Sequence, residues 1–153
     1  MQRSIINYQP LVPILLLFAL IVYESITSIY TFLSPLSGVV FLYLVTNIKN
    51  KEKIFINVIL FLYLVYVEID RGLVVFSSLI LFLIYYEFIH RELVISIGCK
   101  NCLKAVIISF YYIGIYLVNL IISLIFDLNL PIMDITYIIY LITDIFVVLA
   151  NEK

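Results

Sequence analysis

Charged residues are scarce in this chain, and their scarcity excludes a soluble globular domain. Only 12% of the 153 residues are charged, 65% are hydrophobic, and the mean hydropathy is +1.22. Soluble domains are about half apolar and about a quarter charged. The composition therefore predicts an all-α integral membrane protein, with residues 1–153 forming a single transmembrane domain.

Histidine and cysteine are also scarce, with one His and two Cys in the chain. A lone His90 beside Glu87 and Arg91 does not make a metal site, and an ion pair that anchors a helix end explains these residues. Cys99 and Cys102 form a C-x-x-C pair, which elsewhere holds half a zinc site or exchanges disulfides. Without further ligands, free thiols are the expected state. We expect no catalytic residue, metal, cofactor or enzymatic activity.

Long apolar runs dominate the rest of the chain. Because a helix needs about 20 residues to cross a bilayer, six runs are long or nearly long enough, and the short second and third require tilt or a thin membrane. Ser34 and Pro35 form a turn, so the first two spans are expected to make a tight hairpin with Ser34 capping the second. The predicted spans cover residues 13–32, 36–48, 54–67, 73–89, 105–126 and 132–150.

The distribution of basic residues predicts an orientation for these spans. With six crossings, all nine Lys and Arg residues except Arg71 fall on the side that holds both chain ends. Cytoplasmic loops carry the excess of Lys and Arg in membrane proteins. We therefore predict that both termini are cytoplasmic.

Polar residues inside the predicted spans are candidate functional groups, because they are costly in lipid. Glu24 and Asp144 are expected near the bilayer centre, with no Lys or Arg at that depth to pair with either. Their carboxyls should therefore be protonated or hydrogen-bonded. Tyr116 and Asn119 belong to a polar stripe on the fifth span, and Asp134 and Asp144 to one on the sixth. The stripes predict either helix packing through hydrogen bonds or a polar, solute-binding interior.

The loops opposite the basic side are acidic. Glu68, Asp70, Asp127 and Asp134 are expected there, against Arg71 alone. Charged loop tips commonly serve solubility. An acidic collar of this kind is also suited to receive a basic segment of an extracytoplasmic partner, because complementary charge orients docking.

The run from Leu33 to Leu93 resembles the central part of the rod shape-determining protein MreD family. Pro35 stands at the start of an early span, and residues 49–53 form a short basic turn. A span then ends in the acids Glu68 and Asp70, before Gly72 opens the next. The resemblance implies a multi-pass protein of the bacterial inner (cytoplasmic) membrane. The implied fold is a six-helix bundle that the family shares with the substrate-binding S-components of energy-coupling-factor transporters.

The same resemblance implies a non-catalytic subunit of the cell-elongation complex, which serves rod shape and peptidoglycan synthesis. Its partners would be membrane lipid, MreC, and RodA with its transpeptidase, without nucleic acid. The expected partner-binding residues are Glu68, Asp70, Arg71 and Gly72. The alternative is a small-solute-binding transporter subunit whose site is the polar interior of Glu24, Tyr116, Asn119, Asp134 and Asp144.

Overall fold

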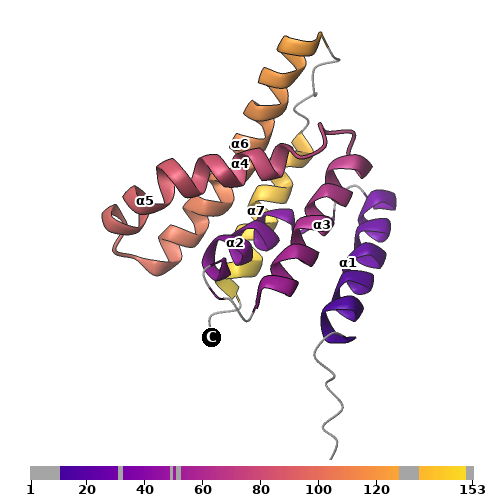
Figure 1. Cartoon of the computed structure of the whole chain (residues 1–153), viewed down its shortest axis with the longest axis horizontal. Helices are drawn as coiled ribbons and strands as arrows, with labels where there is room; N and C mark the ends of the chain where they lie inside the picture. Colours follow the sequence, from indigo (N-terminus) through magenta and orange to yellow (C-terminus); the bar gives the residue numbers. More distant parts are fainter. Residues whose placement is uncertain (1–10, 31–32, 49, 51–52, 128–134, 151–153) are drawn as a thin grey trace, which may run out of the picture.

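The computed structural model describes residues 11–30, 33–48, 50, 53–127 and 135–150, and every regular element in that part of the chain is helical (Figure 1). This result confirms the predicted all-α class. The elements are α1 (Leu11–Ile29), α2 (Ser37–Asn47), α3 (Ile54–Asp70), α4 (Ser77–Ile84), η2 (Tyr85–Ile89), α5 (His90–Ser96), α6 (Lys100–Phe126) and α7 (Ile135–Ala150).

The helices coincide with the predicted apolar segments, but several ends differ: α3 runs on to Asp70 rather than ending at Val67, and α6 begins at Lys100 rather than Ala105. The first helix ends at Ile29 rather than Phe32. The fourth begins at Ser77, turns through one π-helical segment, and runs on to Ser96 instead of ending at Ile89. Of the described helices, α6 is long and apolar enough to cross a membrane on its own, with 27 residues. At about 1.5 Å per residue it spans about 40 Å.

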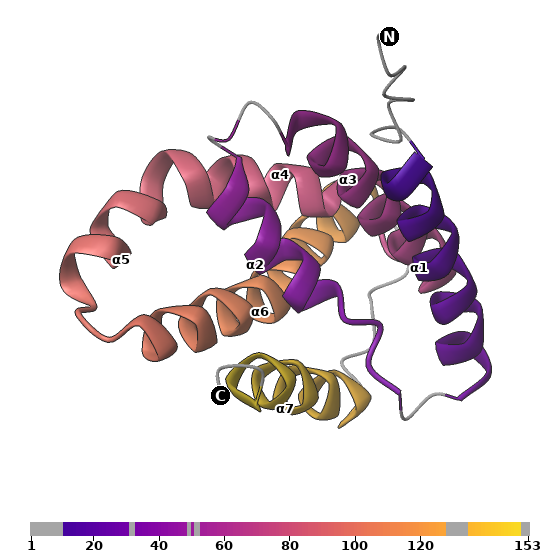
Figure 2. The ribbon, with the colours of Figure 1, turned by 90° about the horizontal axis from the view of Figure 1, so that it is seen from below.

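The short helix α2 lies at the centre of the fold. It packs against α3, α6 and α7, and Figure 2 shows it with these helices around it. Its Phe41 and Leu44 are completely buried, and Phe41 lies 4.9 Å from Tyr111 of α6 between ring centroids. The tight hairpin predicted for the first two helices is wrong, because α1 packs on α3 rather than on α2.

The π-helical segment η2 joins α4 to α5. Such segments insert one extra residue per turn and change which side chains face the core. The predicted ion pair of Glu87 with His90 or Arg91 is accordingly not formed; the ion pair found among the described residues lies elsewhere. The His90 ring instead stacks on Tyr86, with 5.6 Å between centroids.

Two glycines, Gly38 and Gly114, lie where helices make close contacts. A Cβ atom on Gly38 of α2 would lie 2.8 Å from Asp144 Oδ2, 2.9 Å from Tyr112 Cε2 and 3.0 Å from Ile108 Cγ2. Gly114 of α6 similarly meets the side chain of Leu81. Small residues at such points let helix backbones approach each other.

The first prediction tests this packing. The substitution Gly38→Ala should destabilise the fold by about 2 kcal/mol. The added methyl group would overpack the contact of α2 with α6 and α7, and this cost outweighs the gain of about 1 kcal/mol in helix propensity. The control is Gly98→Ala, whose Cβ would meet no atom within 4 Å. Thermal unfolding followed by circular dichroism in detergent measures the difference. Equal midpoints for Gly38→Ala and the unmodified chain would contradict the placement of α2.

Candidate functional site

The carboxylate of Asp144 caps the beginning of α2. It accepts hydrogen bonds from the backbone N–H of Gly38 at 3.0 Å, the Tyr112 hydroxyl at 2.9 Å, and the Ser34 hydroxyl. The first N–H groups of any helix lack intrahelical partners, and an anion there also meets the positive end of the helix dipole. The prediction that Ser34 caps α2 is therefore wrong. The carboxylate of Asp144 caps this helix, and the Ser34 hydroxyl donates a hydrogen bond to that carboxylate.

Glu68 of α3 caps the beginning of α4 in the same manner. Its carboxylate accepts hydrogen bonds from Phe76 N at 2.7 Å, from the Ser77 hydroxyl at 2.7 Å, and from Ser78 N. The residues just before the two capped helices, Leu36 and Phe76, both have left-handed backbones, with φ of 55° and 70°. Bulky residues rarely adopt this conformation, so the surrounding contacts must hold it.

Asn119 supports the segment that leads into α4. Its Oδ1 accepts a hydrogen bond from Val74 N at 2.6 Å, and its Nδ2 donates to Ser77 Oγ at 3.2 Å and to Ile115 O at 2.8 Å. The side chain is buried. The predicted polar stripe on the fifth span is thus directed inward at Asn119, while Tyr116 is half-buried.

Glu24 of α1, which is fully buried, forms an ion pair with the partly buried Arg71. The guanidinium donates from Nε to Glu24 Oε1 at 3.2 Å, from Nη1 to the Tyr140 hydroxyl at 3.0 Å, and from Nη2 to Thr27 Oγ1 at 3.1 Å. The Tyr63 hydroxyl lies 3.4 Å from Glu24 Oε2. The prediction that no basic residue reaches Glu24 is therefore wrong.

Helix length explains this correction. Because α1 ends at Ile29, Glu24 lies five residues, or about 7.5 Å, from the helix end. The side chain of Arg71, just after the end of α3, can therefore reach Glu24 and pair with it. Glu24 and Asp144 are both fully buried, but each has its own set of partners.

The predicted acidic collar is only partly exposed. Glu68 has no exposed surface, so its assignment to a surface collar is wrong, and the capping role explains its burial. Asp70 and Gly72 are exposed, and Arg71 is partly buried by its pairing with Glu24. Asp134 lies outside the described residues. Asp70 and Gly72 therefore remain as exposed candidates for a partner-binding surface.

A cavity of about 230 Å³ opens beside the Glu24–Arg71 pair. Among the described residues, three of the five guanidinium N–H donors of Arg71 have partners, and the Arg71 side chain lines the cavity. The guanidinium carbon lies 5.3 Å from the centroid of the Tyr140 ring, which fixes its orientation. Neither Glu24 nor Asp144 lines this space. The polar wall is formed by Ser37, Glu68, Arg71, Tyr111, Tyr112, Thr136, Tyr137 and Tyr140.

Two further groups of reactive side chains do not line the cavity. Cys99 and Cys102 are exposed free thiols at the beginning of α6. Near η2, the Tyr85 hydroxyl and His90 Nδ1 are buried without a hydrogen-bond partner. Within the described residues, no three His, Cys, Asp or Glu side chains converge to hold a metal ion.

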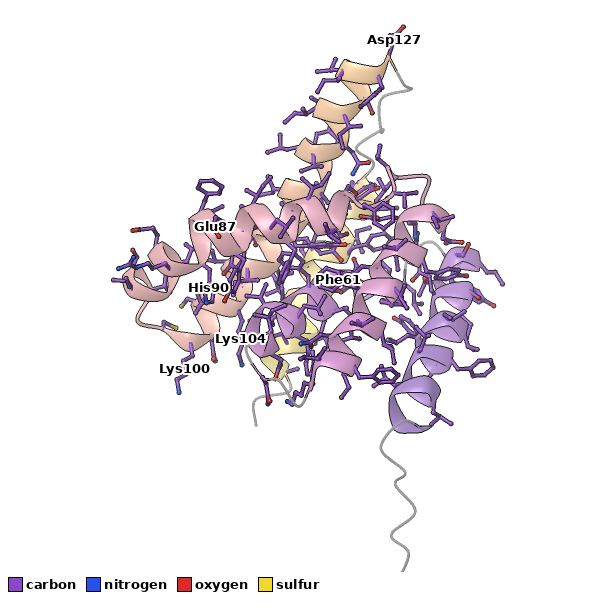
Figure 3. All side chains as sticks on the ribbon, in the orientation of Figure 1. Phe61, Glu87, His90, Lys100, Lys104 and Asp127 are labelled. Atoms are coloured by element: carbon purple, nitrogen blue, oxygen red, sulfur yellow. The ribbon has the colours of Figure 1, made fainter. Side chains whose placement is uncertain are left out.

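Figure 3 places the labelled charged residues at separate ends of the fold. Asp127 is at one extremity, where α6 ends, and Lys100 and Lys104 are near the other end of that helix. Comparison with protein-family models, with curated proteins and with solved structures finds no match for this chain.

The second prediction tests the buried ion pair. Replacing Arg71→Met should cost about 3 kcal/mol of stability, because it leaves a buried carboxylate without its counter-charge. The additional change Glu24→Gln should recover most of that loss, which gives a coupling energy of about 2 kcal/mol. Arg91→Met, at an exposed position, is the control. Strictly additive effects in thermal unfolding would contradict the pairing.

Proposed function

We propose that this chain is a multi-pass protein of a bacterial inner membrane. The proposal rests on a distribution of polar and apolar side chains that is the reverse of a soluble protein's. Glu24, Glu68 and Asp144 have no exposed surface, whereas large apolar side chains are exposed on the outer faces of the helices. Lipid favours this arrangement, and water does not. The exposed apolar residues include Phe18, Leu62, Leu83, Ile121, Leu124 and Phe146.

We propose six crossings with both termini in the cytoplasm, because this arrangement puts all Lys and Arg residues except Arg71 on one side. In Figure 1 the α3–α4 loop and the last turn of α6 lie toward the top, while the end of α7 lies toward the bottom. Arg71 is the exception to the basic cytoplasmic side, and its charge is compensated by Glu24 inside the protein. An Arg neutralised in this way is compatible with the outer side.

We further propose a non-catalytic, partner-binding role of the MreD type. The Leu33–Leu93 resemblance suggests it. The use of the buried acids for helix caps and an ion pair agrees with it, because these contacts give each of them a structural role. The proposed partner surface is the α3–α4 turn, defined as residues 69–76, where Ile69, Asp70 and Phe76 are exposed. Its partner would be a basic extracytoplasmic segment of an MreC-like protein.

The third prediction tests this surface. The charge reversal Asp70→Lys should lower recovery of the partner several-fold, because exposed charges at the rim of an interface guide association. The measurement is affinity purification from native membranes with quantitative mass spectrometry. Glu87→Lys reverses an exposed acid of η2, outside this turn, and should leave recovery unchanged. Unaltered recovery with Asp70→Lys would exclude this turn as the interface.

A second candidate function, small-solute binding, is favoured by the cavity at Arg71. Glu24 and Asp144, the solute ligands that the sequence suggested, do not line this cavity, and protein groups already bind both carboxylates. The Arg71 guanidinium and the tyrosine walls instead suit a small, planar molecule with an acceptor atom. The volume of about 230 Å³ is smaller than the ~300–1,000 Å³ of sites for drug-sized ligands.

The fourth prediction distinguishes this candidate. Thr136 lines the cavity, so Thr136→Trp should fill it and abolish retention of any bound small molecule. Native mass spectrometry of protein from native membranes gives the readout. Ile142→Trp, at an exposed position of the same helix, should retain the molecule. A wild-type protein that carries no small molecule, or equal occupancy in both variants, would rule against solute binding.

A further inference from the structure

The structure assigns a dithiol–disulfide exchange site to Cys99 and Cys102, with accessible disulfides as its substrate class. The two Sγ atoms are 2.6 Å apart, and both residues are exposed. A disulfide bond is about 2.05 Å long, so bond formation requires the sulfurs to approach by only about half an ångström. Exposure lets an incoming disulfide reach the pair.

The local geometry makes the two thiols unequal. Cys99 is the residue before the first turn of α6, and its Sγ accepts the backbone N–H of Cys102 at 3.3 Å as well as the Cys102 S–H. Both hydrogen bonds stabilise a thiolate at Cys99. The S–H bond and then the N–H bond from Cys102 lower the pKa of the Cys99 thiol. The dipole of the 27-residue helix acts in the same direction.

The order of the chemical steps follows from this asymmetry. The Cys99 thiolate attacks one sulfur of a disulfide RSSR, forms a Cys99–S–S–R bond and expels one thiolate, RS⁻. Cys102 then loses its proton and attacks the Cys99 sulfur, which forms the Cys99–Cys102 bond and expels the second RS⁻. The dithiol gives up two electrons and two protons in total, and RSSR is reduced to two RSH.

This assignment depends on the first turn of α6 and not on the proposed membrane role. A partner or solute elsewhere in the molecule neither requires nor excludes it. The exchange test can therefore fail while the proposed function is correct, and the proposed function can fail while the exchange test succeeds.

The fifth prediction uses glutathione disulfide as the probe on the full-length chain in detergent, with intact mass measured after acid quenching. The wild-type chain should become two hydrogens lighter and retain no glutathione. Cys102→Ser should instead accumulate one glutathione on Cys99. Cys99→Ser should react more slowly with glutathione disulfide than Cys102→Ser does, because only the Cys99 thiol accepts the two hydrogen bonds that lower its pKa and raise its thiolate fraction.

The controls separate chemistry from folding. The variant with both Cys99→Ser and Cys102→Ser should gain no glutathione, and all variants should keep the circular dichroism spectrum of the wild type. Stable glutathione on both cysteines of the wild type, disulfide-linked dimers, or zinc held by the thiols would overturn the assignment. Equal rates for the single variants would also overturn it.

Discussion

The fold depends on satisfying backbone N–H groups where helices begin inside the protein. Both α2 and α4 start among other helices, and each receives a buried carboxylate, from Asp144 and Glu68 respectively. Without such partners, the first N–H groups of each helix would be desolvated and unpaired, which costs several kcal/mol per group in an apolar medium. Because α2 contacts α3, α6 and α7, a cap on this short helix positions much of the molecule.

The same constraint explains why acidic residues are buried in this fold. In a membrane span, an ionisable residue usually suggests a transport path or a binding site. Here Glu24 is paired with Arg71, and the other two buried acids hold helix ends, so their placement is explained by structure. In the described part of the chain, the candidates for binding are the cavity beside the guanidinium, the exposed α3–α4 turn and the thiols at the beginning of α6.

Much of the helical framework follows from local sequence, because long apolar runs separated by polar turns have few alternatives. The inward direction of Asn119 and Asp144 followed from helical spacing in the same way. The Glu24–Arg71 pair and the Asp144 cap could not be predicted so. They join residues 47 and 106 positions apart, the pair depends on where α1 ends, and the cap follows the left-handed backbone at Leu36. Glu68 resembled a surface acid because sequence alone does not show that the next segment folds back over it.

The most direct test of the proposed membrane protein is its topology, because buried acids with exposed apolar side chains are favourable in lipid and unfavourable in water. A membrane-impermeant maleimide is applied to spheroplasts of cells that express either the wild type or a variant with Cys99→Ser, Cys102→Ser and Asp127→Cys. Asp127 is exposed beyond the end of α6, opposite the end that carries Cys99. The account predicts labelling of the introduced thiol in intact spheroplasts, and labelling of the native pair only after permeabilisation. Labelling of the wild type before permeabilisation, or recovery of the chain in the soluble fraction, would contradict it.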